Sequence, residues 1–157
     1  MKTFLLTLAA GLFMAQATYS QTKQEQMTNI DQKKQDIDNN IGSYQKSMKF
    51  KDGTNSKSVF KDGNELKMVS ISIIDENVDK KVQWYFENGK LIYAQVEWTN
   101  ISTGILVNNQ RTYVDNKQAF SWIKAGNVSV SSSSREFKDM DSELMVYAAN
   151  LQKDSMK

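Results

Sequence analysis

The chain contains no cysteine, no histidine and no proline. Without histidine it cannot build the usual zinc sites, a Ser-His-Asp triad or a histidine general base. Without cysteine it has no thiol nucleophile, no thiolate metal site, no disulfide and no thiol to accept a bacterial lipid anchor. These absences close common routes to catalysis, and no motif indicates a cofactor. We therefore expect no catalytic residue, no metal site and no cofactor.

The chain also lacks an excess of charge of either sign. It has 20 lysine and arginine residues against 18 aspartate and glutamate residues, which gives a formal net charge of +2. Nucleic acids and anionic membrane surfaces attract proteins that carry strongly basic surfaces. The near balance of charge therefore predicts no nucleic-acid partner.

One apolar run stands near the N-terminus. It extends from Phe4 to Ala15 and ends in small residues at Ala15 and Ala17, which is the pattern of a cleavable signal peptide. The run is shorter than the about 20 apolar residues of a transmembrane helix. We therefore expect residues 1–20 to be a bacterial signal peptide, cut after Ala17 or after Ser20. The mature chain is then expected to be periplasmic or secreted, without a membrane anchor.

Residues 22–48 predict a long amphipathic helix, because their apolar residues recur at spacings of three and four. These residues are Met27, Ile30, Ile37, Ile41, Tyr44 and Met48. The stripe has two interpretations: packing on the protein's own sheet, or a coiled-coil seam through which the protein self-associates. We prefer the first, because the strands that follow need a cover.

The next part of the chain combines turn signals with a strand pattern. Phe-Lys-Asp-Gly occurs at residues 50–53 and again at residues 60–63. Asp-Gly favours a turn, because glycine adopts positive φ without a Cβ clash. From Leu66 to Asp75, apolar residues alternate with serines, which predicts a half-buried strand.

Two hairpins and an edge strand are predicted after that strand. The first hairpin covers residues 82–98, with a type I′ turn at Asn88-Gly89. The second covers residues 110–124 and turns at Asn116-Lys117. Residues 127–133 are expected to form a short polar edge strand.

A C-terminal helix completes the predicted fold. Ser133 stands three residues before Glu136, the spacing of a capping box. The apolar residues that follow at helical intervals are Phe137, Met140, Leu144, Tyr147 and Leu151. We therefore predict one α+β domain over residues 21–157, with an N-terminal amphipathic helix, an antiparallel β-meander of about five strands and a C-terminal helix.

The aromatic residues of the two hairpins suggest a candidate binding surface. Counting outward from the turns places Trp84 opposite Tyr93, and Arg111 opposite Trp122. Tryptophan, tyrosine and arginine are frequent anchors of binding sites. We therefore predict a ligand-binding surface made by Trp84, Tyr93, Arg111 and Trp122. The alternative is that these aromatic residues belong to the core of a strongly twisted sheet.

Three functions are compatible with this sequence. The preferred one is an exported, non-catalytic binding module for a small molecule, a glycan or a protein. The second is a carboxylate-dependent hydrolase such as a glycosidase, with Glu87 or Glu97 near the aromatic residues of the sheet. The third is a structural or chaperone-like envelope protein whose N-terminal helix engages another chain.

The sequence Trp-Tyr-Phe-Glu-Asn-Gly-Lys-Leu-Ile-Tyr at residues 84–93 resembles small exported bacterial proteins of unknown function. It also looks like variant MORN repeats, which share an aromatic-x-x-Asn-Gly-Lys-Leu hairpin. The resemblance covers this hairpin alone and implies no activity.

Overall fold

Residues 22–52 and 55–155 are described by a computed structural model of the chain. The predicted signal peptide, and Gly53 of the first Phe-Lys-Asp-Gly turn, lie outside the described residues. The chain divides into two units, Met1–Lys33 and Lys34–Lys157. In the first unit, residues 22–33 are helical. The sheet, the C-terminal helix and every side chain discussed below belong to the second unit.

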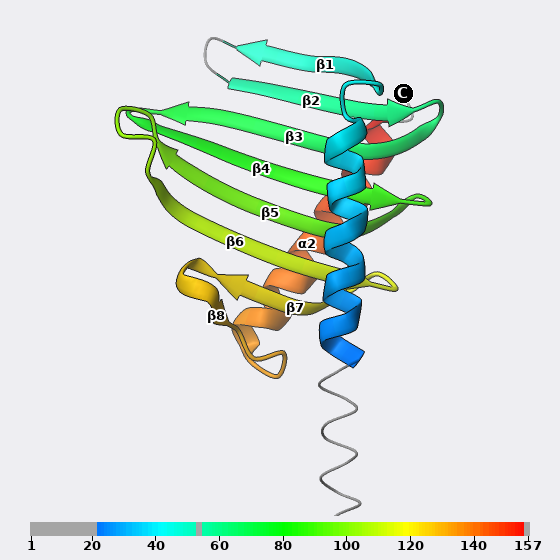
Figure 1. Cartoon of the computed structure of the whole chain (residues 1–157), viewed down its shortest axis with the longest axis vertical. Coiled ribbons are helices and arrows are strands. Elements are labelled where there is room, and N and C mark those ends of the chain that lie inside the picture. The colour runs from blue at the N-terminus through cyan, green and yellow to red at the C-terminus, as the bar shows by residue number, and fades with distance from the viewer. Residues whose placement is uncertain (1–21, 53–54, 156–157) are drawn as a thin grey trace, which may run out of the picture. The chain divides into compact units, whose positions relative to one another are not determined.

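The second unit is built on one antiparallel sheet of eight strands, each hydrogen-bonded to the next strand along the chain (Figure 1). The strands are β1 (Gln45–Asp52), β2 (Asn55–Asp62), β3 (Glu65–Asp75), β4 (Val78–Glu87), β5 (Lys90–Asn100), β6 (Leu106–Asp115), β7 (Gln118–Lys124) and β8 (Val128–Ser129). Tight turns join most of these strands, because antiparallel neighbours need only a short connection. The α+β class is confirmed.

Both predicted hairpin turns are confirmed. The φ angles are 49° at Asn88 and 68° at Gly89, and 49° at Asn116 and 66° at Lys117. A type I′ turn requires positive φ at both central residues, and its twist matches that of the strands that it joins. The sequence signal at each turn therefore located the hairpin correctly.

The prediction of about five strands is wrong, because the sheet has eight. The strands that sequence analysis missed are β1 and β2, which lie at one edge of the sheet. Their sequences, QKSMKFKD and NSKSVFKD, are rich in lysine and serine. Polar and charged residues are common on edge strands, where they discourage pairing with other chains, and they obscure the alternation that reveals a strand.

The predicted helix over residues 22–48 ends earlier than expected. Helical structure covers residues 22–40, a turn follows at residues 41–43, and Met48 lies in β1. Glycine costs about 1 kcal/mol relative to alanine in a helix interior, and Gly42 stands in the turn. The apolar period continued past the helix because Tyr44 and Met48 kept the same spacing by coincidence.

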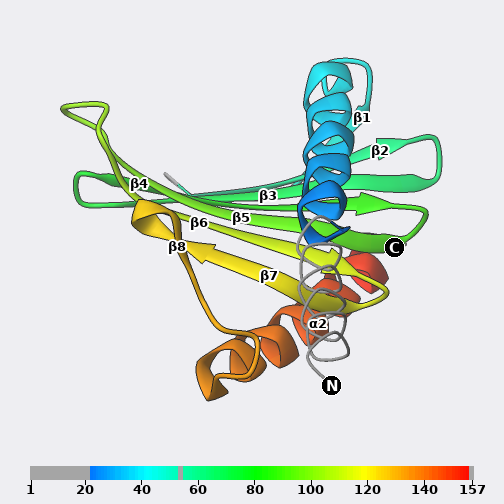
Figure 2. The ribbon, with the colours of Figure 1, turned by 60° about the horizontal axis from the view of Figure 1, so that its bottom comes forward.

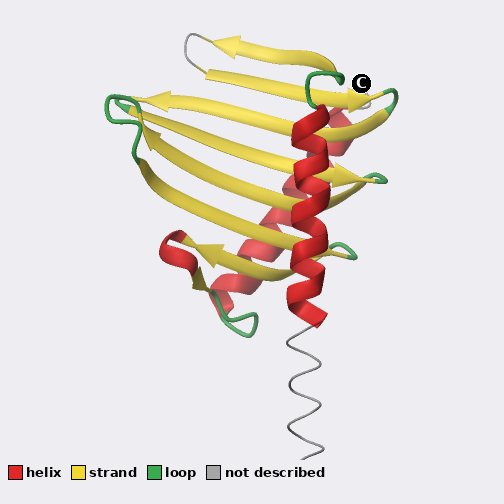
Figure 3. Cartoon of the chain, in the orientation of Figure 1, coloured by secondary structure: helices red, strands yellow, loops and turns green. Residues whose placement is uncertain are grey.

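The C-terminal helix α2 (Arg135–Ser155) crosses one face of the sheet (Figure 2). Its buried side chains include Phe137, Ala148 and Leu151, which pack into a core with Trp84 and Trp122 from the sheet. Figure 3 shows the helix running obliquely behind the strands. Burying this apolar surface supplies most of the free energy that holds helix and sheet together.

The N-cap of α2 is Ser134 and not the predicted Ser133. The hydroxyl of Ser134 accepts a hydrogen bond from the backbone N–H of Phe137 at 3.2 Å. The Oγ of Ser133 lies 2.9 Å from the Oγ of Ser131, outside the helix. A side-chain acceptor at the N-cap satisfies one of the N–H groups that the first turn of a helix leaves unpaired.

No helix in the described part of the chain combines the length and the apolar character needed to cross a bilayer.

Candidate functional site

A pocket of about 310 Å³ lies between α2 and the face of the sheet that this helix covers. Its walls come from β4, β5, β6, β7 and the middle of α2. The lining residues are Val82, Trp84, Ala94, Val96, Gln110, Thr112, Trp122, Met140, Glu143, Leu144 and Tyr147. Most of these side chains are apolar or aromatic, so the pocket favours an apolar guest.

One row of residues across the sheet forms the floor of the pocket. Each residue in this row pairs directly with the next one, on the neighbouring strand. Trp84 faces Ala94, Ala94 faces Thr112, and Thr112 faces Trp122. The two large indoles therefore stand at the ends of this row, with the small side chains of Ala94 and Thr112 between them. This alternation of large and small residues leaves space over the middle strands.

Helix α2 closes the pocket with an aromatic ring of its own. Tyr147 packs on Trp84 with ring centroids 5.0 Å apart and ring planes tilted by 35°. Trp84 is 7 % exposed, whereas Tyr147 is 42 % exposed. The indole therefore forms part of the inner wall, and the phenol ring lies at the side that meets solvent.

Three of the residues that line the pocket have polar side chains: Gln110, Thr112 and Glu143. The indole N–H of Trp122 donates a hydrogen bond to Oε1 of Gln110 at 3.2 Å, which leaves the amide NH₂ of Gln110 as a donor. Thr112 is 6 % exposed. Glu143 is the one charged residue among those that line the pocket, and it lies at an exposed position of α2.

Hydrogen bonds in the N-terminal half and at the C-terminal end of α2 hold the helix against the sheet. The carboxylate of Asp141 accepts a hydrogen bond from the backbone N–H of Ala119 at 2.7 Å. Near the other end, Lys61 donates to the backbone carbonyl of Ser155, and Gln152 donates to the backbone carbonyl of Gly89. These contacts fix where α2 lies on the sheet and therefore set the width of the pocket.

The structure does not bring the four predicted site residues together on one surface. Trp84 and Trp122 line the pocket under α2. Tyr93 pairs with Tyr85 and Tyr113 in a row on the opposite face of the sheet, and Arg111 belongs to that face as well, two residues from Tyr113 along β6. Trp84 and Trp122 are 7 % and 8 % exposed, and both belong to the core cluster that packs with α2.

The predicted pairings of Trp84 with Tyr93 and of Arg111 with Trp122 are wrong. Trp84 faces Ala94, and Arg111 faces Ile123. The counted registers hold for the first two pairs beyond each turn, and then a β-bulge shifts each pairing by one residue. A shift of one residue moves a side chain to the other face of a sheet, which explains why the predicted set divided into two.

The extra residue of each bulge can be identified from the pairing. In the first hairpin Phe86 faces Leu91 and Tyr85 faces Tyr93, so Ile92 is the extra residue. In the second hairpin Phe120 occupies the equivalent place. Bulges increase the local twist and bend a strand, and counting residues from a turn cannot reveal them.

Arg111 lies instead beside a second pocket, of about 220 Å³, between the start of β6 and the 3₁₀ turn η1 (Ala125–Asn127). One guanidinium nitrogen of Arg111 donates a hydrogen bond to Oδ1 of Asn127 at 2.7 Å. Asn127 has a φ of 61°, a conformation that asparagine tolerates better than most residues. The predicted contact between Arg111 and Trp122 is absent, and Trp122 instead has the Lys124 ammonium 4.6 Å from its ring centroid.

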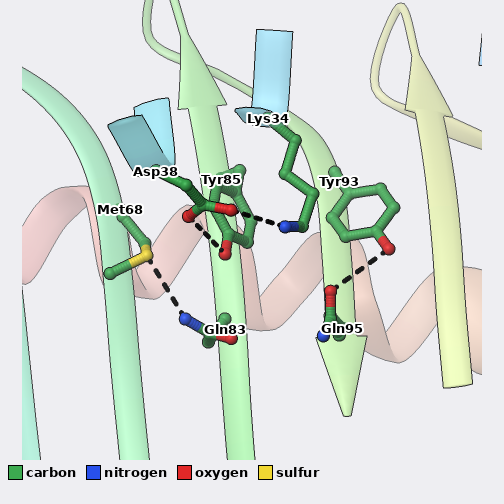
Figure 4. A network of polar contacts seen from close by, with 7 residues as sticks. All are labelled: Lys34, Asp38, Met68, Gln83, Tyr85, Tyr93 and Gln95. Atoms are coloured by element: carbon green, nitrogen blue, oxygen red, sulfur yellow. Dashed lines mark hydrogen bonds and ion pairs between the residues drawn. The ribbon is translucent and has the colours of Figure 1, made fainter. Parts of the chain in front are cut away.

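The opposite face of the sheet carries a polar network that ties residues 34–40 to the strands (Figure 4). The Asp38 carboxylate accepts hydrogen bonds from the hydroxyl of Tyr85 at 3.0 Å and from the Lys34 ammonium at 2.6 Å. The same ammonium lies 5.1 Å from the centroid of the Tyr85 ring and 5.9 Å from that of Tyr93. Ile37, which stands between Lys34 and Asp38 in the sequence, is buried.

Burial and the neighbouring carboxylate together raise the pKa of Tyr85 well above its ordinary value of 10.0. Burial is the larger cause, because the phenolate would lose its hydration. The Asp38 carboxylate adds to the shift, since it repels a phenolate and accepts the phenol proton in a hydrogen bond. Tyr85 is 1 % exposed, and its hydroxyl links the helical segment at Asp38 to the sheet.

Comparison with protein-family models, curated protein sequences and solved structures found no match to this chain. Among the described residues, no group of three or more aspartate or glutamate side chains is placed to hold a metal ion. The description of the candidate site therefore depends on the geometry of the pocket alone.

The polar residues and the helix side of the pocket were not predicted to belong to a site. Tyr147 was assigned to the apolar stripe of the C-terminal helix, and Glu143 was not included in the predicted binding surface. A signal was present, because Met140, Glu143, Leu144 and Tyr147 recur at spacings of three and four and therefore share one helix face. A glutamate within such a stripe indicates a face that meets both the sheet and solvent.

Proposed function

We propose that this protein is an exported, non-catalytic binding module whose pocket under α2 receives a small, predominantly apolar molecule. The observation that carries the proposal is the pocket itself, whose volume of about 310 Å³ falls at the lower end of the range of ligand sites, about 300–1,000 Å³. Such sites combine apolar walls with a few placed polar groups. The export of the chain remains part of the proposal, on the basis of the N-terminal sequence.

The chemistry of the walls supports a ligand with a flat or branched apolar body. Trp84, Trp122 and Tyr147 offer large ring surfaces, and aromatic rings are effective anchors because they lose little conformational entropy on binding. The amide NH₂ of Gln110 and the hydroxyl of Thr112 can orient one polar group of the guest. A guest of this kind gains about 25 cal/mol for each Å² of apolar surface that it removes from water.

A carboxylate-dependent hydrolase has less support from the geometry. Glycoside hydrolysis uses a pair of carboxyl groups that flank the scissile bond, whereas Glu143 is the one carboxylate that lines this pocket. Glu87 and Glu97, which sequence analysis proposed for that role, are not among the lining residues. The pocket therefore favours binding over hydrolysis.

The substitution Ala94→Leu tests the proposal by filling the pocket. Ala94 stands between Trp84 and Thr112 in the pocket row, so a leucine there extends into the space that the guest would occupy. We expect meta-tert-butylphenol to bind the wild-type protein saturably, measured by calorimetry and by the change in tryptophan fluorescence. We expect Ala94→Leu to weaken this binding at least about tenfold, which corresponds to about 1.4 kcal/mol.

The matched control is Ala149→Leu. Ala149 lies on α2 at an exposed position and does not line this pocket, so the same change in side-chain volume leaves the pocket open. Retained binding in this variant, together with loss in Ala94→Leu, supports the proposed site. The proposal is wrong if the wild-type protein does not bind the probe, or if Ala94→Leu binds it as tightly as the wild type does.

A further inference from the structure

We infer that the molecule bound in the pocket under α2 carries a positive charge, so that its class is an organic ammonium cation with an apolar body. This inference rests on the proposed function and adds the charge of the ligand. No lysine or arginine lines the pocket, and its one charged residue, Glu143, is acidic.

Glu143 lies next to the most exposed of the aromatic rings. It precedes Tyr147 by four residues on α2, and residues four apart in a helix are neighbours on one face. Tyr147 in turn packs on Trp84, with ring centroids 5.0 Å apart. We call these three residues the aromatic corner; all three line the pocket, with the Trp84 ring in its inner wall and with Glu143 and Tyr147 at exposed positions of α2.

An ammonium group suits this corner better than a neutral or an anionic group does. The face of an aromatic ring is negative and attracts a cation within about 6 Å of its centroid, and the carboxylate adds an attraction of the same sign. A quaternary ammonium is also weakly hydrated and apolar at its surface, so it loses little on leaving water. A carboxylate or phosphate would instead meet the negative ring faces and Glu143.

The other charged groups near the pocket favour the aromatic corner as the place where a cationic ligand would bind. The Lys124 ammonium already lies over the Trp122 ring, 4.6 Å from its centroid, and it forms an ion pair with Glu136. That end of the pocket wall therefore has its own cation, balanced by its own carboxylate. No ion pair of Glu143 is found among the described residues, so its carboxylate is open to a charge from outside.

The test compares two probes that match in shape and differ in charge. These are meta-hydroxyphenyltrimethylammonium and meta-tert-butylphenol, which differ by one nitrogen in place of one carbon. A cation over aromatic rings gains about 1–2 kcal/mol when it is desolvated, so we expect the ammonium to bind at least about fivefold more tightly than the neutral probe in calorimetric titrations. Added salt should weaken binding of the ammonium and leave the neutral probe unchanged.

Two variants with the same change of charge locate the effect. Because partly exposed charges contribute little, Glu143→Gln should weaken the ammonium about two- to fivefold and leave the neutral probe unchanged. The control Asp139→Asn removes an acidic charge from α2 outside the pocket and should change neither affinity. Tyr147→Leu, which keeps an apolar wall but removes the ring, should weaken the ammonium more than the neutral probe.

The outcomes separate the two proposals. Equal affinity for both probes, or tighter binding of the neutral one, overturns the inference of a cationic ligand and leaves the proposed binding function standing. If neither probe binds to protein that circular dichroism shows to be folded, both proposals are wrong. An effect of Asp139→Asn as large as that of Glu143→Gln shows that the preference for a cation reflects overall charge and not the aromatic corner.

Discussion

The hydroxyl of Tyr85 makes the stability of this protein depend on pH in the alkaline range. In the folded state this phenol is buried and donates to the Asp38 carboxylate, and both features raise its pKa above the ordinary 10.0. The unfolded chain releases the proton near pH 10 while the folded protein keeps it. Above about pH 10, the unfolded state therefore binds fewer protons, and stability falls as the pH rises.

The size of this effect follows from proton linkage. Each pH unit between the unfolded and the folded pKa costs about 1.4 kcal/mol of unfolding free energy for one such group. The substitution Tyr85→Phe removes the titrating hydroxyl. At neutral pH the variant should be less stable by about 1.5 kcal/mol, because it loses a hydrogen bond to a charged group. At about pH 11 the difference in unfolding free energy between the two proteins should nearly vanish, because only the wild type loses stability through the titration of Tyr85.

The measurement is a set of urea unfolding curves for both proteins between about pH 7 and pH 11, followed by circular dichroism. Lysines titrate in both proteins, so their effect cancels in the difference. A third variant, Asp38→Asn, should keep most of the alkaline loss, since burial is the larger cause of the shift. The reasoning is refuted if the unfolding free energies of the wild type and of Tyr85→Phe differ by the same amount at every pH in this range. Tyr85 would then have the same pKa in the folded and the unfolded protein.

Further predictions concern the turn, the helix cap and the pocket. Gly89→Val should destabilise the fold by about 1–3 kcal/mol in urea unfolding, because Gly89 has a φ of 68° that a β-branched residue adopts only with strain; an unchanged midpoint would contradict this. Ser134→Ala should lower the unfolding free energy by about 1 kcal/mol, and Ser133→Ala should lower it clearly less, because Ser134 is the N-cap of α2. A larger loss in Ser133→Ala would show that Ser133 is the N-cap. Ala94→Leu should leave the melting temperature unchanged or raise it, because Ala94 lines the pocket, whereas Ala119→Leu, at a core position that does not line the pocket, should cost about 1–3 kcal/mol; equal losses would show that the space near Ala94 is not available.

Local chemistry in the sequence was enough to place several elements. The turns at residues 88–89 and 116–117 follow from asparagine's and glycine's tolerance of positive φ, which depends on the residues themselves and not on distant contacts. Helix α2 follows from an apolar period that continues over about four helical turns. The α+β class then follows from the order of these elements. The exclusions based on the missing histidine and cysteine also need no structure.

The faces of the sheet were decided by the tertiary structure. One extra residue in each hairpin, Ile92 and Phe120, shifts the pairing and sends Trp84 and Tyr93 to opposite sides. Counting residues outward from a turn assumes an unbroken ladder, so it gives no sign of a residue that the ladder leaves unpaired. The predicted surface of four residues divided for this reason.

The pocket also exists only in the folded molecule, because it joins residues far apart in sequence. Trp84 and Ala94 from the first hairpin, Thr112 and Trp122 from the second, and Tyr147 from α2 meet there. Their meeting depends on where α2 rests on the sheet, which is set by contacts such as that of Asp141 with the backbone of Ala119. The sequence alone determined most of the elements that form, whereas side-chain packing between those elements determined where the pocket lies.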